Sequence, residues 1–385
     1  MNADILIKNG HVIDPSTGTD KIVDIAFVGE KMIDISQGEV APSYIVDAKD
    51  CIVTPGFIDF HSHVFYGDNN SSCNPDSFIP MGVTAAVDAG SAGWANFNSF
   101  YKSIVLSSRL RVKAYIAYSN YGIMNHPESY EIQDVNHERI AYFVNKYPDT
   151  ILGLKLLMVQ PTANDIEPLK RAVKLAEELS VGVCIHVQAS VVSMDDIARI
   201  LRPGDIFCHA FHGKNETILD KSGNVSSEVR KAKERGVIFD MCNGNNNFSF
   251  HVAQKAMEQG IYPDVISSDN TIDKININQC VRSLPYVMSK MLAMGMDLFH
   301  VIKAVTETPA KLMNMHGKIG SLAAGAYADI TITKLKDVRA IHKDAENCKM
   351  AVPRHFIPQM TICGGKIAYS CEEFNLTTDM GWDKP

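Results

Sequence analysis

Eight short apolar runs, separated by longer stretches of helical character, constrain the fold of this chain more than any other feature. The runs cover residues 56–63, 82–89, 112–118, 151–158, 181–187, 205–211, 237–242 and 265–268. Between them, residues 164–179 give the clearest helix, because their apolar side chains share one helical face. Two more helical stretches, 278–294 and 297–315, follow the eighth run. Buried strands alternating with helices predict an α/β fold, a parallel (β/α)₈ TIM barrel.

Both ends of the chain carry a different pattern, in which apolar and polar residues alternate. The alternating stretches are 4–7, 22–28 and 44–47 near the beginning, and 328–333 and 359–363 near the end. Such alternation is typical of half-buried strands. We therefore predict a small β-sandwich domain built from residues 1–54 together with 318–372. The barrel is expected to comprise residues 55–317, and residues 373–385 are expected to form a C-terminal tail.

Charge and cysteine content exclude several classes of function. The chain has 37 basic and 44 acidic side chains, a formal net charge of −7 and no basic cluster, which argues against nucleic-acid and membrane partners. No apolar run is long enough to span a bilayer, and Asp4 and Lys8 interrupt the place of a signal-peptide core. Nine scattered cysteines favour reduced, buried thiols. We expect a cytoplasmic homo-oligomer that acts on a small molecule.

The first apolar run ends in the first candidate metal ligands. His61 and His63 are two residues apart, so on a strand their side chains point to the same side. That spacing alone suits two ordinary polar residues at a strand end as well as it suits a metal site. Further ligand types occur at or near the ends of later runs, namely Lys155, His186, His209 and Asp269. Because catalytic groups of a barrel gather at the carboxyl ends of its strands, this recurrence favours a metal centre.

Lys155 lies inside an apolar run, where an ammonium is costly unless its charge is paired or removed. Three interpretations are open: a Schiff-base lysine as in barrel aldolases, a structural ion pair, or a neutral amine. A neutral amine can take up carbon dioxide and form a carbamate that bridges two divalent metals. The surrounding histidines favour the carbamate, since a Schiff-base site has no use for them.

Together these residues resemble the binuclear amidohydrolase superfamily. The resemblance covers nearly the whole chain and includes PGFIDFHSH at 55–63 and GAYADI at 325–330. Residues 208–216 and 244–256 resemble the dihydroorotase-like amidohydrolase/deacetylase branch of that superfamily. One departure is His212, where that branch commonly carries an asparagine.

The resemblance implies two divalent cations, with zinc the expected ion and a carbamate on Lys155 bridging them. Their remaining ligands would be His61, His63 and Asp269 for the more buried ion, and His186 and His209 for the more exposed one. A hydroxide shared by the cations would be the nucleophile, and Asp269 would be the catalytic acid–base.

The implied activity is zinc-dependent hydrolysis of a C–N bond other than a peptide bond. The substrate would be an N-acyl derivative of a small carboxylate, or a related acetyl ester. Two alternatives remain open. One is a cyclic amidohydrolase that opens a dihydroorotate- or hydantoin-like ring with the same metal centre. The other is a non-catalytic relative that has lost its metals, although the full set of ligand types argues against it.

Loops at the carboxyl rim of a barrel commonly set substrate specificity. The candidate substrate contacts, in the loops after the sixth and seventh runs, are His212, Lys214, Asn245 and Asn247. The asparagines are equally common in plain turns, and Lys214 is as consistent with a solvated charge. Asp59, two residues before His61, is expected to orient its strand or the neighbouring residues.

Overall fold

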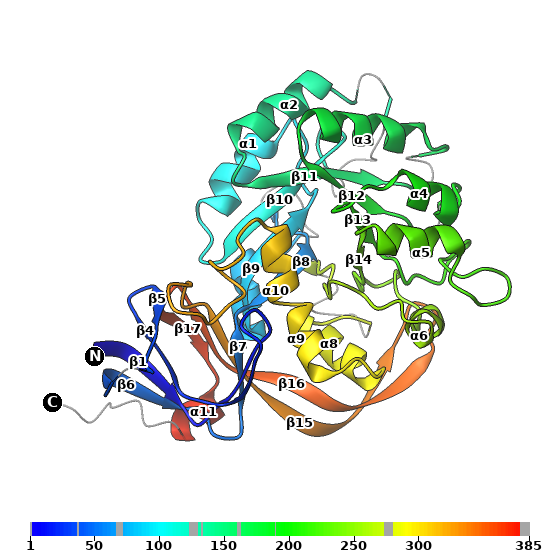
Figure 1. Ribbon diagram of the computed structural model, residues 1–385. Coiled ribbons are helices and arrows are strands. Elements are labelled where there is room, and N and C mark those ends of the chain that lie inside the picture. Colours follow the sequence, from blue (N-terminus) through cyan, green and yellow to red (C-terminus); the bar gives the residue numbers. More distant parts are fainter. Residues whose placement is uncertain are drawn as a thin grey trace.

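A parallel seven-stranded sheet, curled into a barrel, forms the centre of the molecule (Figure 1). The computed structural model describes residues 2–36, 38–66, 72–122, 130–131, 134–159, 163–188, 190–272 and 280–377. The strands follow one another around the barrel in chain order: β8 (Phe57–Ser62), β9 (Val83–Ala89), β10 (Arg111–Ala117), β11 (Ile151–Leu157), β12 (Gly182–His186), β13 (Ile206–Cys208) and β14 (Ile238–Asp240). They are the first seven of the predicted apolar runs.

The eighth apolar run closes the barrel without forming a regular strand. It makes one parallel bridge on each side, from Val265 to Asp240 of β14 and from Asn270 to Ser62 of β8. Its backbone turns at Asp269, where φ is 55°, and this interrupts the extended conformation. The predicted (β/α)₈ fold is therefore confirmed, with its eighth position irregular.

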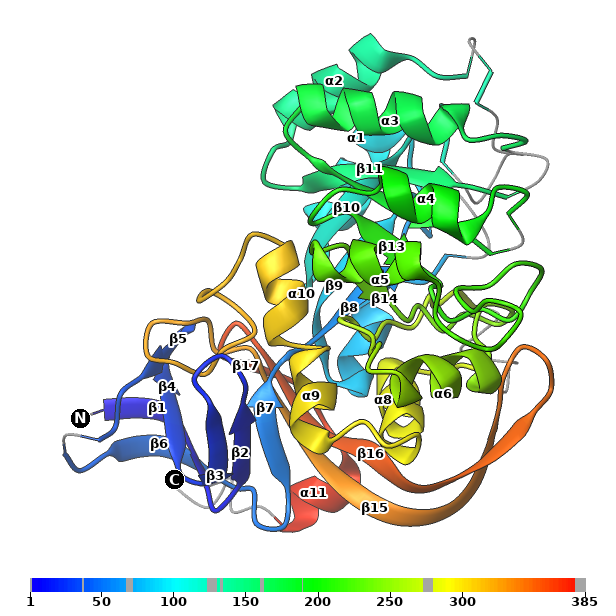
Figure 2. The same cartoon turned by 45° about the vertical axis from the view of Figure 1, so that its right-hand side comes forward.

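Helices cover the outside of the barrel (Figures 1 and 2). They are α1 (Phe97–Phe100), α2 (His137–Lys146), α3 (Glu167–Glu178), α4 (Met194–Ile200), α5 (Ser227–Glu234), α6 (Phe250–Glu258), α8 (Leu284–Ala293), α9 (Leu298–Lys303) and α10 (Glu307–Leu312). Helix α3 begins at Glu167 rather than at residue 164. Pro168 lies in its first turn, where the backbone N–H that proline lacks would have no hydrogen-bond partner within the helix. The stretch predicted over 297–315 is two helices, α9 and α10. In the part of the chain that the structure describes, no helix has the length and apolarity needed to cross a membrane.

Two sheets built from the chain ends form the predicted β-sandwich. The four-stranded sheet has the order β5-β4-β1-β6, from β1 (Asn2–Lys8), β4 (Ile25–Val28), β5 (Lys31–Ile33) and β6 (Ala41–Asp47). The six-stranded sheet has the order β17-β16-β15-β7-β2-β3, from β2 (His11–Asp14), β3 (Thr19–Ile22), β7 (Ile52–Pro55), β15 (Ile330–Lys343), β16 (Lys349–Cys363) and β17 (Lys366–Ser370). Because β7 pairs with β15, the two chain ends share one sheet.

The short helix α11 (Glu372–Thr377) follows β17 and covers the sandwich core. Its Phe374 is buried in the same apolar cluster as Phe27 and Ile330. The stretch that the sequence assigns to a tail thus begins with a packed helix. The domain boundaries themselves stay a prediction.

Strands β15 and β16 continue far beyond the sandwich as one long hairpin (Figures 1 and 2). Alternation predicted strands only over 328–333 and 359–363, because the pairing of the two strands shifts register after Ile332 and again after Asp337, which breaks a continuous alternation. The hairpin packs along α8, where Phe356 N donates to Ser289 Oγ at 3.0 Å. Its turn reaches the start of α6, beside the rim where the barrel strands end.

Candidate metal centre

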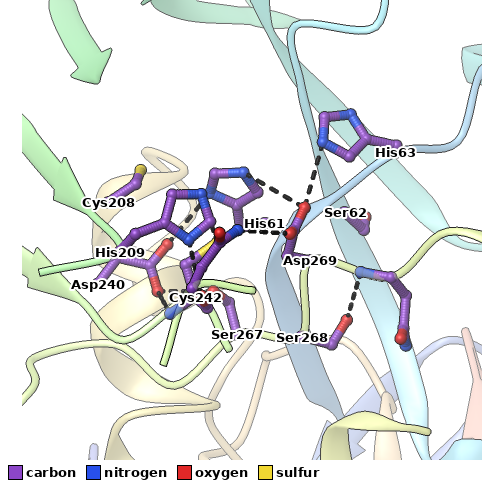
Figure 3. A network of polar contacts seen from close by, with 12 residues as sticks. His61, Ser62, His63, Cys208, His209, Asp240, Cys242, Ser267, Ser268 and Asp269 are labelled. Atoms are coloured by element: carbon purple, nitrogen blue, oxygen red, sulfur yellow. Dashed lines mark hydrogen bonds and ion pairs between the residues drawn. The ribbon is translucent and has the colours of Figure 1, made fainter. Parts of the chain in front are cut away.

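Six ligand-type side chains lie at the carboxyl end of the barrel strands. They lie at the end of β8 or directly after it, on β11, on β12, after β13 and directly after the eighth run: His61, His63, Lys155, His186, His209 and Asp269. The imidazole rings stand close together, with ring centroids 5.8 Å apart for His61 and His63, 5.4 Å for His61 and His209, and 4.1 Å for His186 and His209. Strands distant in the sequence thus bring four rings to one place, as Figure 3 shows for three of them.

Three of these residues direct donor atoms toward one point. His63 Nε2 is 3.3 Å from Asp269 Oδ1, and His61 Nε2 is 4.0 Å from the same oxygen (Figure 3). All three side chains are buried. Lys155 Nζ adds a fourth polar atom 3.2 Å from His61 Nε2. Imidazole nitrogens and carboxylate oxygens converging in a buried place suit a divalent cation such as zinc.

The second ring nitrogen, Nδ1, of three histidines lies beside another polar group. Metal-binding histidines are typically fixed in this way, because the outer contact sets both tautomer and ring orientation. The contacts are His63 Nδ1 with Ser91 Oγ at 2.9 Å, His209 Nδ1 with Cys242 O at 2.8 Å, and His61 Nδ1 with Asp240 Oδ2 at 3.3 Å.

Asp240, the last residue of β14, is a residue of the site that sequence reasoning missed. Its carboxylate is fully buried, and Oδ1 accepts hydrogen bonds from Ser267 Oγ at 2.6 Å and from Cys242 N at 3.0 Å. Burial raises the pKa of this carboxyl to about 8. A ligand-type residue near the end of an apolar run was the available signal, as it was for His186.

Asp59 holds the segment that carries Asp269. Asp59 Oδ1 accepts from Ser268 N at 3.0 Å, and Oδ2 accepts from Ser268 Oγ at 2.5 Å. Burial raises the pKa of the Asp59 carboxyl to about 6. This contact makes Asp59 an orienting residue for the eighth run.

Three residues at this rim have a left-handed backbone. The φ angles are 57° at His209, 39° at Cys242 and 55° at Asp269. Side-chain-bearing residues rarely adopt such angles, which cost on the order of 1–3 kcal/mol each. Strain of this kind persists where the surrounding structure fixes a side chain for a function. Two of the three residues are proposed metal ligands.

The charges of the cluster differ between the imidazoles and the amine. Burial lowers the pKa of His61 and His186 well below the ordinary value, and neighbouring cationic groups lower it further. Both rings are therefore neutral, which is the form that binds a metal. Burial also lowers the pKa of Lys155, but the nearby Cys184 thiol, other thiols and Asp269 raise it above its ordinary value. The sequence argument expected a neutral amine. In the chain without bound cations, the surroundings of Lys155 instead favour the charged form of the amine.

The four candidate substrate contacts have different surroundings. Asn247 is buried, and its Nδ2 lies 3.4 Å from Asp269 Oδ2. His212 is fully buried and neutral, since burial lowers its pKa to about 4. Its Nδ1 accepts from Lys214 N at 3.3 Å, and among the described residues its Nε2 has no partner. Asn245 Oδ1 is likewise buried without a described partner, whereas the Lys214 side chain is exposed.

Comparison with known proteins places the whole architecture among characterised enzymes. Residues 52–368 match the amidohydrolase family. A deacetylase of Agrobacterium fabrum is 30% identical over 376 residues, covering 95% of this chain and 92% of that protein. The crystal structure of an adenine deaminase superposes with a TM-score of 0.88 at 27% identity, covering 96% of this chain and 100% of the other. That of a dihydroorotase gives 0.84 at 28% identity, covering 95% and 99%.

Proposed function

This chain belongs to the amidohydrolase family, and from that premise we propose that it is a metal-dependent deacetylase. It would hydrolyse the amide C–N bond of a small N-acyl carboxylate, or the acetyl ester of a related hydroxy acid. The observation that carries the proposal is the convergence of His61, His63 and Asp269 beside the Lys155 amine. The similarity to a deacetylase along nearly the full chain supports it.

We assign two divalent cations, zinc by their donor set, to this cluster. One cation would be held by His61, His63 and Asp269, and the other by His186 and His209. A carbamate on Lys155 would contribute to both sites. The outer contacts on Nδ1 of His61, His63 and His209 support this, because metal-binding histidines are typically oriented by a group on the second ring nitrogen. When bound, such cations lower the pKa of water toward about 7 and polarise a carbonyl group.

Asp269 would move the proton of the reaction. Its Oδ1 faces the histidines, so Oδ2 is the oxygen placed to accept a proton from the attacking water. Water oxygen adds to the acyl carbon, the C–N bond breaks, and the proton held on Oδ2 passes to the leaving nitrogen. Asn247 Nδ2, at 3.4 Å, orients that oxygen, and Asp59 fixes the backbone through Ser268.

Ring opening of a cyclic amide is the second candidate function, because the likeness to a dihydroorotase covers 95% of this chain. The same metal ligands would serve it, and only the rim loops would differ. The likeness to an adenine deaminase raises deamination as a third reaction. Lys155 argues against a mononuclear deaminase, since such a site does not need a lysine on the fourth barrel strand. The complete ligand set argues against a non-catalytic protein.

We also propose a cytoplasmic homo-oligomer. All nine cysteines are free thiols, which supports a reducing compartment. Ile22 and Tyr44 of the sandwich expose 74% and 50% of their surface, and exposed apolar side chains of this kind support contact between copies.

A substrate screen tests the proposed function. Zinc-loaded protein is assayed with N-acetyl and N-formyl amino acids, acetylated hydroxy acids, dihydroorotate, hydantoin and adenine. We expect hydrolysis of an acylated carboxylate that is lost in Lys155→Ala and kept in Lys113→Ala. Lys113 is the matched control, because it lies on the neighbouring strand β10 and donates to Met313 O instead. Ring opening or deamination alone would contradict the proposal.

A further inference from the structure

The turn of the β15–β16 hairpin, residues 344–348 (the hairpin tip), is bonded to the loop after β14, residues 243–250. Asp344 organises the tip, since its Oδ1 accepts from Glu346 N and Cys348 N, each at 2.9 Å. Its Oδ2 accepts from Phe250 N at 3.0 Å, and Ala345 N donates to Phe248 O at 3.0 Å. A segment from the sandwich end of the chain thus holds the loop that carries Asn245 and Asn247.

Glu346 reaches both rim loops at once. Its Oε2 accepts from Ser249 Oγ at 2.9 Å, and its Oε1 lies so close to Gly213 that an added Cβ there would be 2.4 Å from it. Ser249 N in turn donates to Phe211 O at 2.9 Å. The Glu346 carboxylate therefore sits where the loop of residues 211–216, which carries His212, meets the loop of residues 243–250.

Helix α8 adds a buried lysine to the same junction. Lys290 is fully buried, and its Nζ donates to Asn243 Oδ1 at 2.7 Å, Cys280 O at 2.9 Å and Lys343 O at 3.4 Å. The centroid of the Phe248 ring lies 5.1 Å from the same Nζ. One amine thus joins the start of the loop and the last residue of β15 by hydrogen bonds.

The loop held in this way touches the proposed catalytic acid–base directly. Asn247 Nδ2 lies 3.4 Å from Asp269 Oδ2, and a Cβ added to Gly244 would meet the same oxygen at 2.6 Å. The loop backbone therefore packs against Asp269 with no spare room. A small shift of the hairpin tip would be passed along this loop to Asn245 and Asn247, the two candidate substrate contacts that it carries.

We propose that the hairpin tip positions the two substrate loops, and that Glu346 is the residue that sets their spacing and thereby substrate affinity. Glu346 touches neither the ligand cluster nor Asp269 in any described contact, so it is a positioning residue that acts through Ser249 and Gly213. The kinetic part of this inference rests on the proposed hydrolase function, whereas its structural part does not.

The kinetic test compares Glu346→Ala with Glu346→Gln and Glu373→Ala in zinc-loaded protein, using the acylated amino acid hydrolysed fastest in the screen. We expect Glu346→Ala to raise KM about fivefold with kcat within about twofold, because one charge-assisted hydrogen bond near solvent is lost. Glu346→Gln keeps an acceptor for Ser249 Oγ and should restore KM. Glu373, bonded to Lys336 near the other end of the hairpin, is the matched control. An unchanged KM in Glu346→Ala, or no rescue by Gln, would overturn the inference.

Hydrogen exchange separates this inference from the proposed function. In Glu346→Ala, amides of both loops, 211–216 and 243–250, should exchange about fivefold faster than in the unaltered protein, with bound zinc and the melting temperature retained. Glu373→Ala should leave both loops unchanged. If no acylated substrate is hydrolysed but both loops loosen, only the proposed function fails. Unchanged exchange in both loops would overturn the positioning role whatever the activity.

Discussion

Lys155 Nζ lies 3.2 Å from His61 Nε2, although 94 residues separate the two in the chain. Strands β11 and β8 bring them together inside the barrel, and both side chains are buried. An amine at this place is where a carbamate would supply the anion that two cations need to share one site. Several predictions about metal binding depend on this pair.

Removing the Lys155 amine should remove most of the metal. We expect purified protein to carry about two zinc ions per chain and Lys155→Ala to carry well under one, since the bridging anion is lost. A short carboxylic acid such as propionate should restore part of the activity by taking the place of the carbamate. Metal analysis and assays with and without the acid measure this. Full metal content and activity in Lys155→Ala would refute the carbamate.

Replacing Asp269 should affect turnover far more than folding. In Asp269→Asn, we expect kcat to fall about 10²- to 10⁴-fold, because the amide cannot take a proton from the attacking water. Asp264→Asn is the matched control: Asp264 precedes the same barrel run, at its other end, and pairs with Lys233 at 2.5 Å. Steady-state kinetics and thermal unfolding distinguish the two variants. Turnover close to normal in Asp269→Asn would place the acid–base elsewhere.

Asp240 should control metal affinity through His61. Because Asp240 Oδ2 lies 3.3 Å from His61 Nδ1, Asp240→Ala is expected to weaken zinc binding about 10- to 100-fold. Asp240→Asn keeps a hydrogen-bond acceptor beside the ring and should weaken it less. Competition with a chromogenic chelator measures both affinities. Equal affinities in the alanine variant and the unaltered protein would show that His61 needs no outer partner.

The hairpin should also make stability depend on acid pH. Burial is the main reason that the pKa of His342 falls from 6.5 to about 3, and the nearby Lys290, His355 and Arg282 lower it further. The His342 ring stacks on Tyr286. The unfolded chain therefore binds a proton below pH about 6.5 that the folded chain rejects, so folding stability falls as the pH drops from there toward 3. Between pH 7 and 5 this one group should remove about 2 kcal/mol.

Urea unfolding at the two pH values checks this, with His342→Phe as the comparison. Phenylalanine keeps an aromatic ring for Tyr286 but cannot titrate, so the variant should lose about 2 kcal/mol less between pH 7 and 5. Equal losses in both proteins would show that His342 is protonated in the folded state.

Much of this fold was predictable because burial leaves a local pattern in the sequence. The apolar runs marked the barrel strands, and alternation marked the first strands of the sandwich. The middle of the β15–β16 hairpin was not predicted, because register shifts after Ile332 and Asp337 divide its alternation into short pieces. The contact of Glu346 with Ser249 depends on that hairpin, so no local pattern indicated it.

The ligand-type residues stood out because each is a chemically unusual residue in an apolar run. Their surroundings did not stand out. Asp240 resembles any acidic residue after a strand, and its role follows only from its contact with His61. No local pattern in the sequence indicated the left-handed angles at His209 and Asp269 either.

Anomalous diffraction at the zinc edge from crystals of the zinc-loaded protein tests the central claim most directly. We predict two anomalous peaks, one among His61, His63 and Asp269 and one beside His186 and His209, with electron density for a carboxylate continuing beyond Lys155 Nζ. Density that ends at Nζ, with no anomalous peak among these side chains, would contradict the account.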